Sequence, residues 1–102
     1  MARRLQLHEI LCDILGSRNV YFQPPASVFL KYPCIKYTLS GVDARRADNG
    51  LYKKVDRYEI IAITSDPDSD IIDKVLTRFP MCRFDRWYAA DNLNHYVFTL
   101  YY

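Results

Sequence analysis

The stretch that decides the fold is Leu51–Thr64, which reads LYKKVDRYEIIAIT. Alternate residues from Tyr58 to Ala62 are apolar and share one face of an extended strand. Ile61 and Ile63 add apolar side chains to the other face, so this end of the strand is buried on both sides. The segment therefore predicts a long strand whose end is central in a sheet.

The residues before this strand predict its hairpin partner. In Cys34–Leu39, the side chains of Ile35, Tyr37 and Leu39 fall on one side, as expected for a half-buried strand. The polar segment Ser40–Gly50 lies between the two strand-like runs, and we interpret it as a long hairpin loop.

A second helix follows the central strand. Asp66 and Pro67 favour a helix start, because Asp accepts hydrogen bonds from free amides and proline is tolerated at the first helical position. Pro80 ends the helix. The predicted buried stripe consists of Ile72, Val75, Leu76 and Phe79.

The C-terminal part predicts an antiparallel hairpin. Its strands are Met81–Tyr88 and His95–Tyr102, and the turn-rich residues 89–94 join them. One face of the last strand is apolar, so the chain's end is expected to be structural. That face consists of Tyr96, Phe98, Leu100 and Tyr102.

The N-terminal part predicts an amphipathic helix and a loop. Gly16 favours a left-handed helix end, and Pro24 with Pro25 makes Ser17–Phe29 a loop that holds a short edge strand at Val20–Phe22. The helix stripe has the spacing of one helix face. It consists of Leu7, Ile10, Leu11, Ile14 and Leu15.

Length and composition fit one globular domain over residues 1–102. The chain has 102 residues, of which 50% are hydrophobic and 25% charged. The element order is helix, two strands, helix, two strands. We expect the α+β class, with a mostly antiparallel sheet of about four strands and both helices on one face.

Charge and cysteine usage narrow the function classes. A formal net charge of +2 is too small to indicate a nucleic-acid or membrane partner by itself. Cys12, Cys34 and Cys82 are odd in number and widely spaced, which favours a reducing compartment over a disulfide framework or a zinc site. No stretch serves as a signal peptide or membrane span.

No motif for metal, cofactor or catalysis stands out. The acidic run that begins at Asp66 copies the start of a calcium loop, but Ile71 and Thr77 replace its glycine and glutamate. His8 and Cys12 are one helical turn apart without further ligands nearby. His8 and His95 lack a local nucleophile motif, so we expect a protein that is not an enzyme and needs no cofactor or metal.

Basic residues do gather around the predicted hairpin. They are Arg45, Arg46, Lys53, Lys54 and Arg57, with Tyr52 and Tyr58 interleaved. This pattern could hold a nucleic-acid backbone. The acidic residues among them, such as Asp43 and Asp56, lower the local potential. A mixed-charge hairpin that docks to a neighbouring subunit is therefore the favoured interpretation.

Three segments carry a resemblance to a known family. The ending Phe84–Tyr102, FDRWYAADNLNHYVFTLYY, resembles that of small tail-completion or tail-terminator proteins of long-tailed bacteriophages. The segments Val20–Pro25, VYFQPP, and Tyr32–Ile35, YPCI, are similar to such proteins as well. The resemblance extends over most of the chain in the order of elements.

The resemblance implies a structural virion protein of the phage tail, assembled in the host cytoplasm. Such a protein forms a ring, a hexamer in the family, at the head-proximal end of the tail tube. There it ends tube growth and joins the tail to the head. Its partners would be copies of itself, the tail tube protein and a head-completion or connector protein, with a lumen for DNA passage, no specific nucleic-acid binding and no membrane.

The same resemblance suggests two contact regions. The hairpin Val42–Lys54, with Arg45 and Arg46, would contact a subunit or the tube, together with the basic residues that follow it. The loop Tyr21–Val28 would form a second contact through Tyr21, Phe22 and Gln23. Two other functions stay open: a small nucleic-acid-binding domain, and a hydrolase or transferase if His8 or His95 meets Asp or Cys in a cleft.

Overall fold

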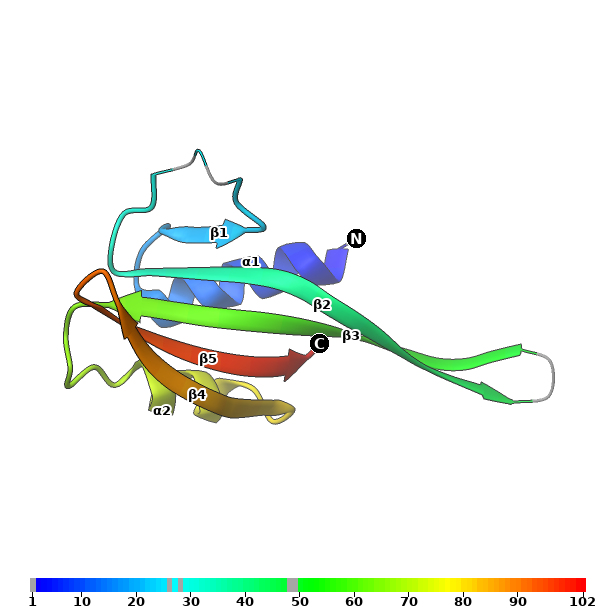
Figure 1. Ribbon diagram of the computed structural model, residues 1–102. Coiled ribbons are helices and arrows are strands. Elements are labelled where there is room, and N and C mark those ends of the chain that lie inside the picture. Colours follow the sequence, from blue (N-terminus) through cyan, green and yellow to red (C-terminus); the bar gives the residue numbers. More distant parts are fainter. Residues whose placement is uncertain (1, 26, 28, 48–49) are drawn as a thin grey trace.

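The computed structural model describes the backbone of residues 2–25, 27, 29–47 and 50–102, and the side chains of residues 4–25, 27, 29–42 and 55–102. Within these residues the chain forms two helices and one five-stranded sheet (Figure 1). The elements are α1 (Ala2–Leu15), β1 (Val20–Phe22), β2 (Cys34–Ala47), β3 (Gly50–Thr64), α2 (Ile71–Arg78), β4 (Cys82–Ala90) and β5 (Leu93–Tyr101).

The sheet is mixed, with the strand order β1-β2-β3-β5-β4. Strand β1 runs parallel to β2, and the other neighbours are antiparallel. The α+β class is confirmed, but the expected sheet of about four mostly antiparallel strands is wrong in detail. Residues 23–33 are long enough to return the chain to its starting end, which makes the parallel fifth strand feasible.

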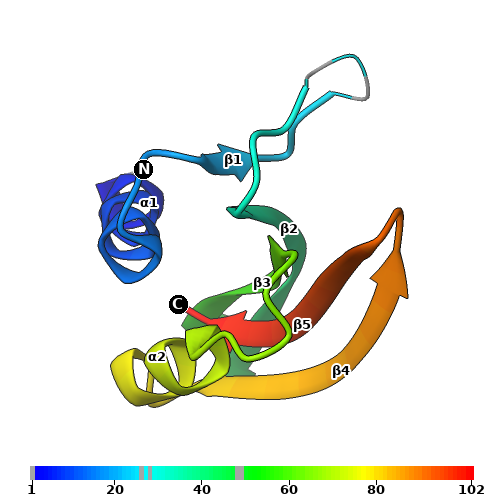
Figure 2. The same ribbon diagram turned by 90° about the vertical axis from the view of Figure 1, so that its left-hand side faces the viewer.

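Both helices cover the same face of the sheet (Figure 2). Helix α1 packs on β1 and β2, α2 packs beside β4, and the two helices contact each other. The buried apolar residues form one cluster between the helices and the sheet. Its fully buried members include Leu7, Leu11, Ile35, Tyr37, Ile60, Val75 and Phe98.

The end of α1 follows the prediction. Gly16 has a φ of 79°, and its backbone N–H donates to the Cys12 carbonyl at 2.9 Å. A residue without Cβ adopts this left-handed conformation at the lowest cost. The predicted buried stripe is confirmed at Leu7 and Leu11, while Ile10 and Ile14 are half-buried at its edge.

Helix α2 begins later than predicted. The Asp66 Oδ1 atom accepts a hydrogen bond from the Asp68 backbone N–H at 2.9 Å, so the residues after Thr64 form a turn rather than a helix start. The helix begins at Ile71. This shift moves the buried stripe to Ile71, Val75 and Phe79 and leaves Leu76 37% exposed, contrary to the prediction.

The predicted loop 40–50 is also wrong, because β2 continues as a strand to Ala47. Opposite it, β3 begins at Gly50, and register positions such as Asp43 with Val55 continue the ladder. Alternation of apolar and polar residues marks only strands with one buried face. Residues 40–47 alternate only from Val42 to Arg45 and break the pattern at Arg46, so this mostly polar segment resembled a loop.

The C-terminal hairpin confirms the predicted antiparallel pair, with a tighter turn. Asp91 and Asn92 have φ values of 53° and 62°, as in a two-residue hairpin turn of the primed type. The predicted turn 89–94 is thus shorter than expected. Tyr96, Phe98 and Leu100 are buried on one face of β5, as predicted.

Candidate functional site

The outer half of the β2–β3 hairpin, residues 41–56, projects beyond the rest of the sheet (Figure 1); we call it the arm. In the described part of the chain, β3 pairs with β5 from Arg57 to Thr64, and β1 pairs with β2 from Ile35 to Tyr37. The arm strands therefore pair with each other beyond both neighbours. The radius of gyration is 14.7 Å, above the roughly 13 Å typical of a compact chain of this length.

The arm places four predicted contact residues next to one another along its strands. Arg45 and Lys53 are Cα partners, and Lys54 faces Ala44 in the adjacent pair. The side chains of Arg45, Arg46, Lys53 and Lys54 lie outside the described residues. Directly opposed like charges destabilise a strand pair.

The fifth predicted residue, Arg57, lies where the arm leaves the body. The Ser40 hydroxyl donates to the Arg57 carbonyl at 3.1 Å and accepts from Arg57 Nε at 3.4 Å. The β2–β3 register shifts between Leu39 and Gly41. A side chain at Gly41 would collide with the Arg57 guanidinium, so the glycine leaves room for it. Arg57 thus connects β3 to β2 at the base of the arm.

The second predicted contact region holds a loop in place. Phe22 packs on Tyr37 with ring centroids 4.9 Å apart. The Arg4 guanidinium lies 4.5 Å from the centroid of the Phe22 ring. The Gln23 Oε1 atom accepts from the backbone N–H of Leu39 at 3.1 Å. These contacts anchor β1 and the start of the loop to β2.

Phe29 is an exposed apolar residue between β1 and β2, and it lies outside the residues predicted for the second contact. It is 95% exposed. The hydroxyl of Tyr21 accepts from the backbone N–H of Lys31 at 3.3 Å and so ties the far side of the loop to β1. Because a short apolar run between prolines is also typical of a buried strand, its exposure could not be read from the sequence.

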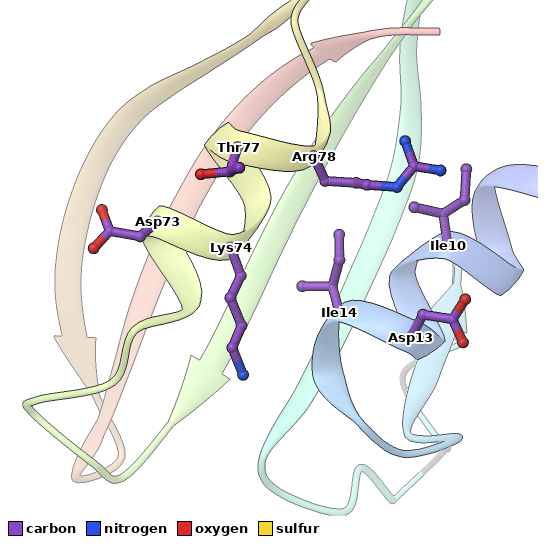
Figure 3. A pocket seen from close by; sticks show the side chains of 7 residues that line it. All are labelled: Ile10, Asp13, Ile14, Asp73, Lys74, Thr77 and Arg78. Atoms are coloured by element: carbon purple, nitrogen blue, oxygen red, sulfur yellow. The ribbon is translucent and has the colours of Figure 1, made fainter.

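A groove lies between the two helices (Figure 3). Its volume is about 530 Å³, and the side chains of Ile10 and Ile14 point into it from α1. Asp13 lies on its α1 side, and α2 contributes Asp73, Lys74, Thr77 and Arg78. This groove was not predicted from the sequence, since no local pattern indicates that α1 and α2 are neighbours.

The two histidines lie on opposite faces of the sheet. Under the helices, His8 Nδ1 is 2.9 Å from the hydroxyl of Tyr37. Burial, followed by the charges of Arg18 and Arg4, lowers the pKa of His8 below 6.5. On the other face, the ring of His95 stacks on Tyr88 at 4.6 Å.

Other reactive side chains show no metal-binding arrangement in the part of the chain that the structure describes. There, no three His, Cys, Asp or Glu side chains are grouped as metal ligands. Cys12, Cys34 and Cys82 are free thiols. Burial raises the pKa of Cys34 and of Cys82 to about 11, which keeps both protonated at neutral pH.

Among the described residues, neither helix is long and apolar enough to cross a membrane.

Comparison with protein families and curated sequences adds no relative to this description. No protein-family model matches the chain, and no curated protein sequence matches it significantly.

Proposed function

We propose that this protein is a structural, non-catalytic virion protein that assembles into a ring at the head-proximal end of a phage tail tube. The ring would end tube growth and form the joint with the head. The observation that carries the proposal is the arm, a two-stranded extension whose strands pair with each other beyond the last residues that pair with β1 and β5. At its base, the Tyr102 backbone N–H donates to the Asp56 carbonyl at 3.0 Å. The resemblance of the sequence to tail-terminator proteins supplies the biological setting.

A hairpin with no other element packed on it is unstable. A two-stranded hairpin is marginally stable in water, because it buries little apolar surface. Arg45 and Lys53 are Cα partners in the arm, and like charges at partnered positions destabilise a strand pair. Contact with another subunit would bury its faces and pair its charges. An arm of this kind therefore supports assembly as its role.

The edges of the sheet disfavour the alternative of assembly by strand addition. Strand β1 has three residues, and the pairing of β4 shifts in register between Phe84 and Arg86. Arg83 and Arg86 are exposed on β4. Short edges, bulges and edge charges all hinder edge-to-edge pairing. The arm is thus the better candidate for a subunit contact.

Light scattering over a range of concentrations, with negative-stain imaging, tests the proposal. We expect closed rings with a central hole. The double variant Arg45→Glu/Arg46→Glu should lose the rings, whereas Arg83→Glu/Arg86→Glu, with the same charge change on β4, should keep them. Rings of unchanged mass from the arm variant would show that the arm assignment is wrong, and a monomer at every concentration would contradict self-assembly.

A nucleic-acid-binding domain is the second hypothesis, and salt dependence separates it from the first. Tyr58, one of the aromatics that would stack on bases, is 5% exposed. Binding through phosphates weakens steeply with salt. If the ring proposal is correct, a mobility-shift assay at two salt concentrations should show no nucleic-acid complex that is weakened by salt. A tight complex at low salt that the arm variant abolishes would favour the second hypothesis.

A further inference from the structure

An aromatic knob and an apolar groove lie on opposite sides of the molecule. The segment between β1 and β2, which carries Phe29, lies away from the helices, whereas the groove lies between α1 and α2 (Figures 2 and 3). One chain cannot place its own Phe29 in its own groove. A second copy in the same orientation can present its knob to that groove.

The knob has the properties of an interface anchor. Phe29 is 95% exposed, and water contact with a whole phenyl ring is unfavourable. The Tyr21 hydroxyl accepts from the backbone N–H of Lys31, two residues after Phe29, and so ties that side of the ring to β1. This bond reduces the conformational entropy that is lost when the ring becomes buried.

The groove has the properties of the matching receptor. Its volume of about 530 Å³ lies within the range of sites that enclose a small ligand. Ile10 and Ile14 give it an apolar side on α1. At the rim, Lys74 Nζ lies 3.5 Å from the Asp70 carboxylate, which offsets the lysine charge.

The charge beside the knob is complementary to the α1 side of the groove. Residues 14–42 contain no Asp or Glu, and their charged side chains are Arg18, Lys31 and Lys36. Lys31, two residues after Phe29, is exposed. On the α1 side the groove offers Asp13, which is exposed, while its α2 side carries Asp73 together with Lys74 and Arg78. A lysine beside a ring that lies along α1 would thus meet the Asp13 carboxylate.

We propose that Phe29 of one copy inserts into the α1–α2 groove of a second copy, with Lys31 facing Asp13. The contact is heterologous, because different surfaces of the two copies meet, and such a contact gives a ring when the rotation closes. The inference rests on the proposed self-assembly and names a second contact besides the arm.

Two variants and two controls test the contact by light scattering. Phe29→Ala removes the knob, and Thr77→Arg fills the groove with a charged side chain. Each should weaken self-association by at least about tenfold, as expected for the loss of an interface anchor. Met81→Ala truncates another exposed apolar residue, and Leu76→Arg places the same side chain on α2 outside the groove. Both controls should assemble normally.

Mixing the two variants provides the decisive measurement. The Phe29→Ala copy keeps an intact groove, and the Thr77→Arg copy keeps an intact knob. Both variants also carry Arg45→Glu/Arg46→Glu, which removes the proposed arm contact. At concentrations where each of them alone is monomeric, the mixture should form dimers through the one intact knob-and-groove contact and no larger species. Circular dichroism and urea unfolding establish that each variant is folded.

The outcomes distinguish this contact from the ring itself. Wild-type rings together with unchanged rings from both variants would overturn the knob-and-groove contact and leave the ring proposal standing. Open chains of growing mass, with dimers in the mixture, would support the contact and contradict ring closure. A wild-type protein that is monomeric at every concentration would overturn both.

Discussion

The two halves of the β2–β3 hairpin differ in what surrounds them. In the inner half, Ile35, Tyr37 and Ile60 are fully buried under the helices. In the outer half, the arm, the strands continue the same ladder without neighbouring strands, and Val42 near its base is 48% exposed. One pair of strands thus passes from the core of the protein into solvent (Figure 1).

This difference shows that strand pairing and stability are separate properties. Backbone hydrogen bonds connect both halves, and among the side chains that the structure describes, the buried apolar cluster lies at the inner half. The inner half therefore contributes to the stability of the body. The outer half is available for contacts with other molecules.

The largest expected difference in stability between the inner half and the arm comes from a matched pair of substitutions along β2. Ile35→Ala should lower the free energy of unfolding by about 2–5 kcal/mol, because it leaves a cavity in the core. Val42→Ala should change it by no more than about 0.5 kcal/mol. Urea unfolding of the monomer, followed by Trp87 fluorescence, measures both. Similar losses at the two positions would contradict the division into body and arm.

Removal of the arm is the next test. A variant with residues 42–55 replaced by Asn-Gly, a preferred two-residue hairpin turn, should keep its free energy of unfolding within about 1 kcal/mol, since shortening a connection has a small entropic effect. It should fail to form rings. As a control, a Gly/Ser segment of the original length keeps the connection without the strands. Unfolding of the body after arm removal would show that the stability of the body depends on the arm.

The junction between body and arm should be sensitive to a smaller change. The Cβ of Gly41→Ala would meet the guanidinium of Arg57. Because this is the end of a flexible side chain, the variant should lose less than about 1 kcal/mol of stability. Arg57→Ala in the same chain should remove that loss, as a double-mutant cycle would show. A loss that persists would place the strain in the backbone.

The smallest expected effect concerns pH and belongs to the body alone. Because burial and the charges of Arg18 and Arg4 lower the pKa of His8 below its ordinary value of 6.5 in the folded state, the unfolded chain binds more protons as the pH falls through this value. Stability should therefore decrease between about pH 7.5 and about pH 5. His8→Gln should reduce this decrease, as measured by urea unfolding at both pH values.

A carboxylate contribution is separable in the same experiment. The pKa values of Glu9 and Asp85 lie below 4.5 and 3.8, respectively, so their stabilising effect is lost only at lower pH. The arm-deleted protein should keep the pH dependence of the wild type. If it lost that dependence, the titrating group would lie in the arm rather than at His8.

The prediction from sequence succeeded where one face of an element is buried. The alternation from Tyr96 to Leu100 defined β5, and Gly16 marked the end of α1. It failed at residues 40–47, where apolar and polar residues alternate only from Val42 to Arg45, and at α2, where a local turn after Asp66 delays the helix. Periodicity reports burial rather than hydrogen bonding.

The α+β class and most of the elements could be predicted from the sequence, because apolar periodicity is a local property that records which face is buried. The parallel pairing of β1, the length of the arm, the exposure of Phe29 and the groove beside Ile14 follow only from the folded chain. Each of these depends on which distant segments become neighbours. That choice is made by packing of the whole chain, which no local pattern encodes.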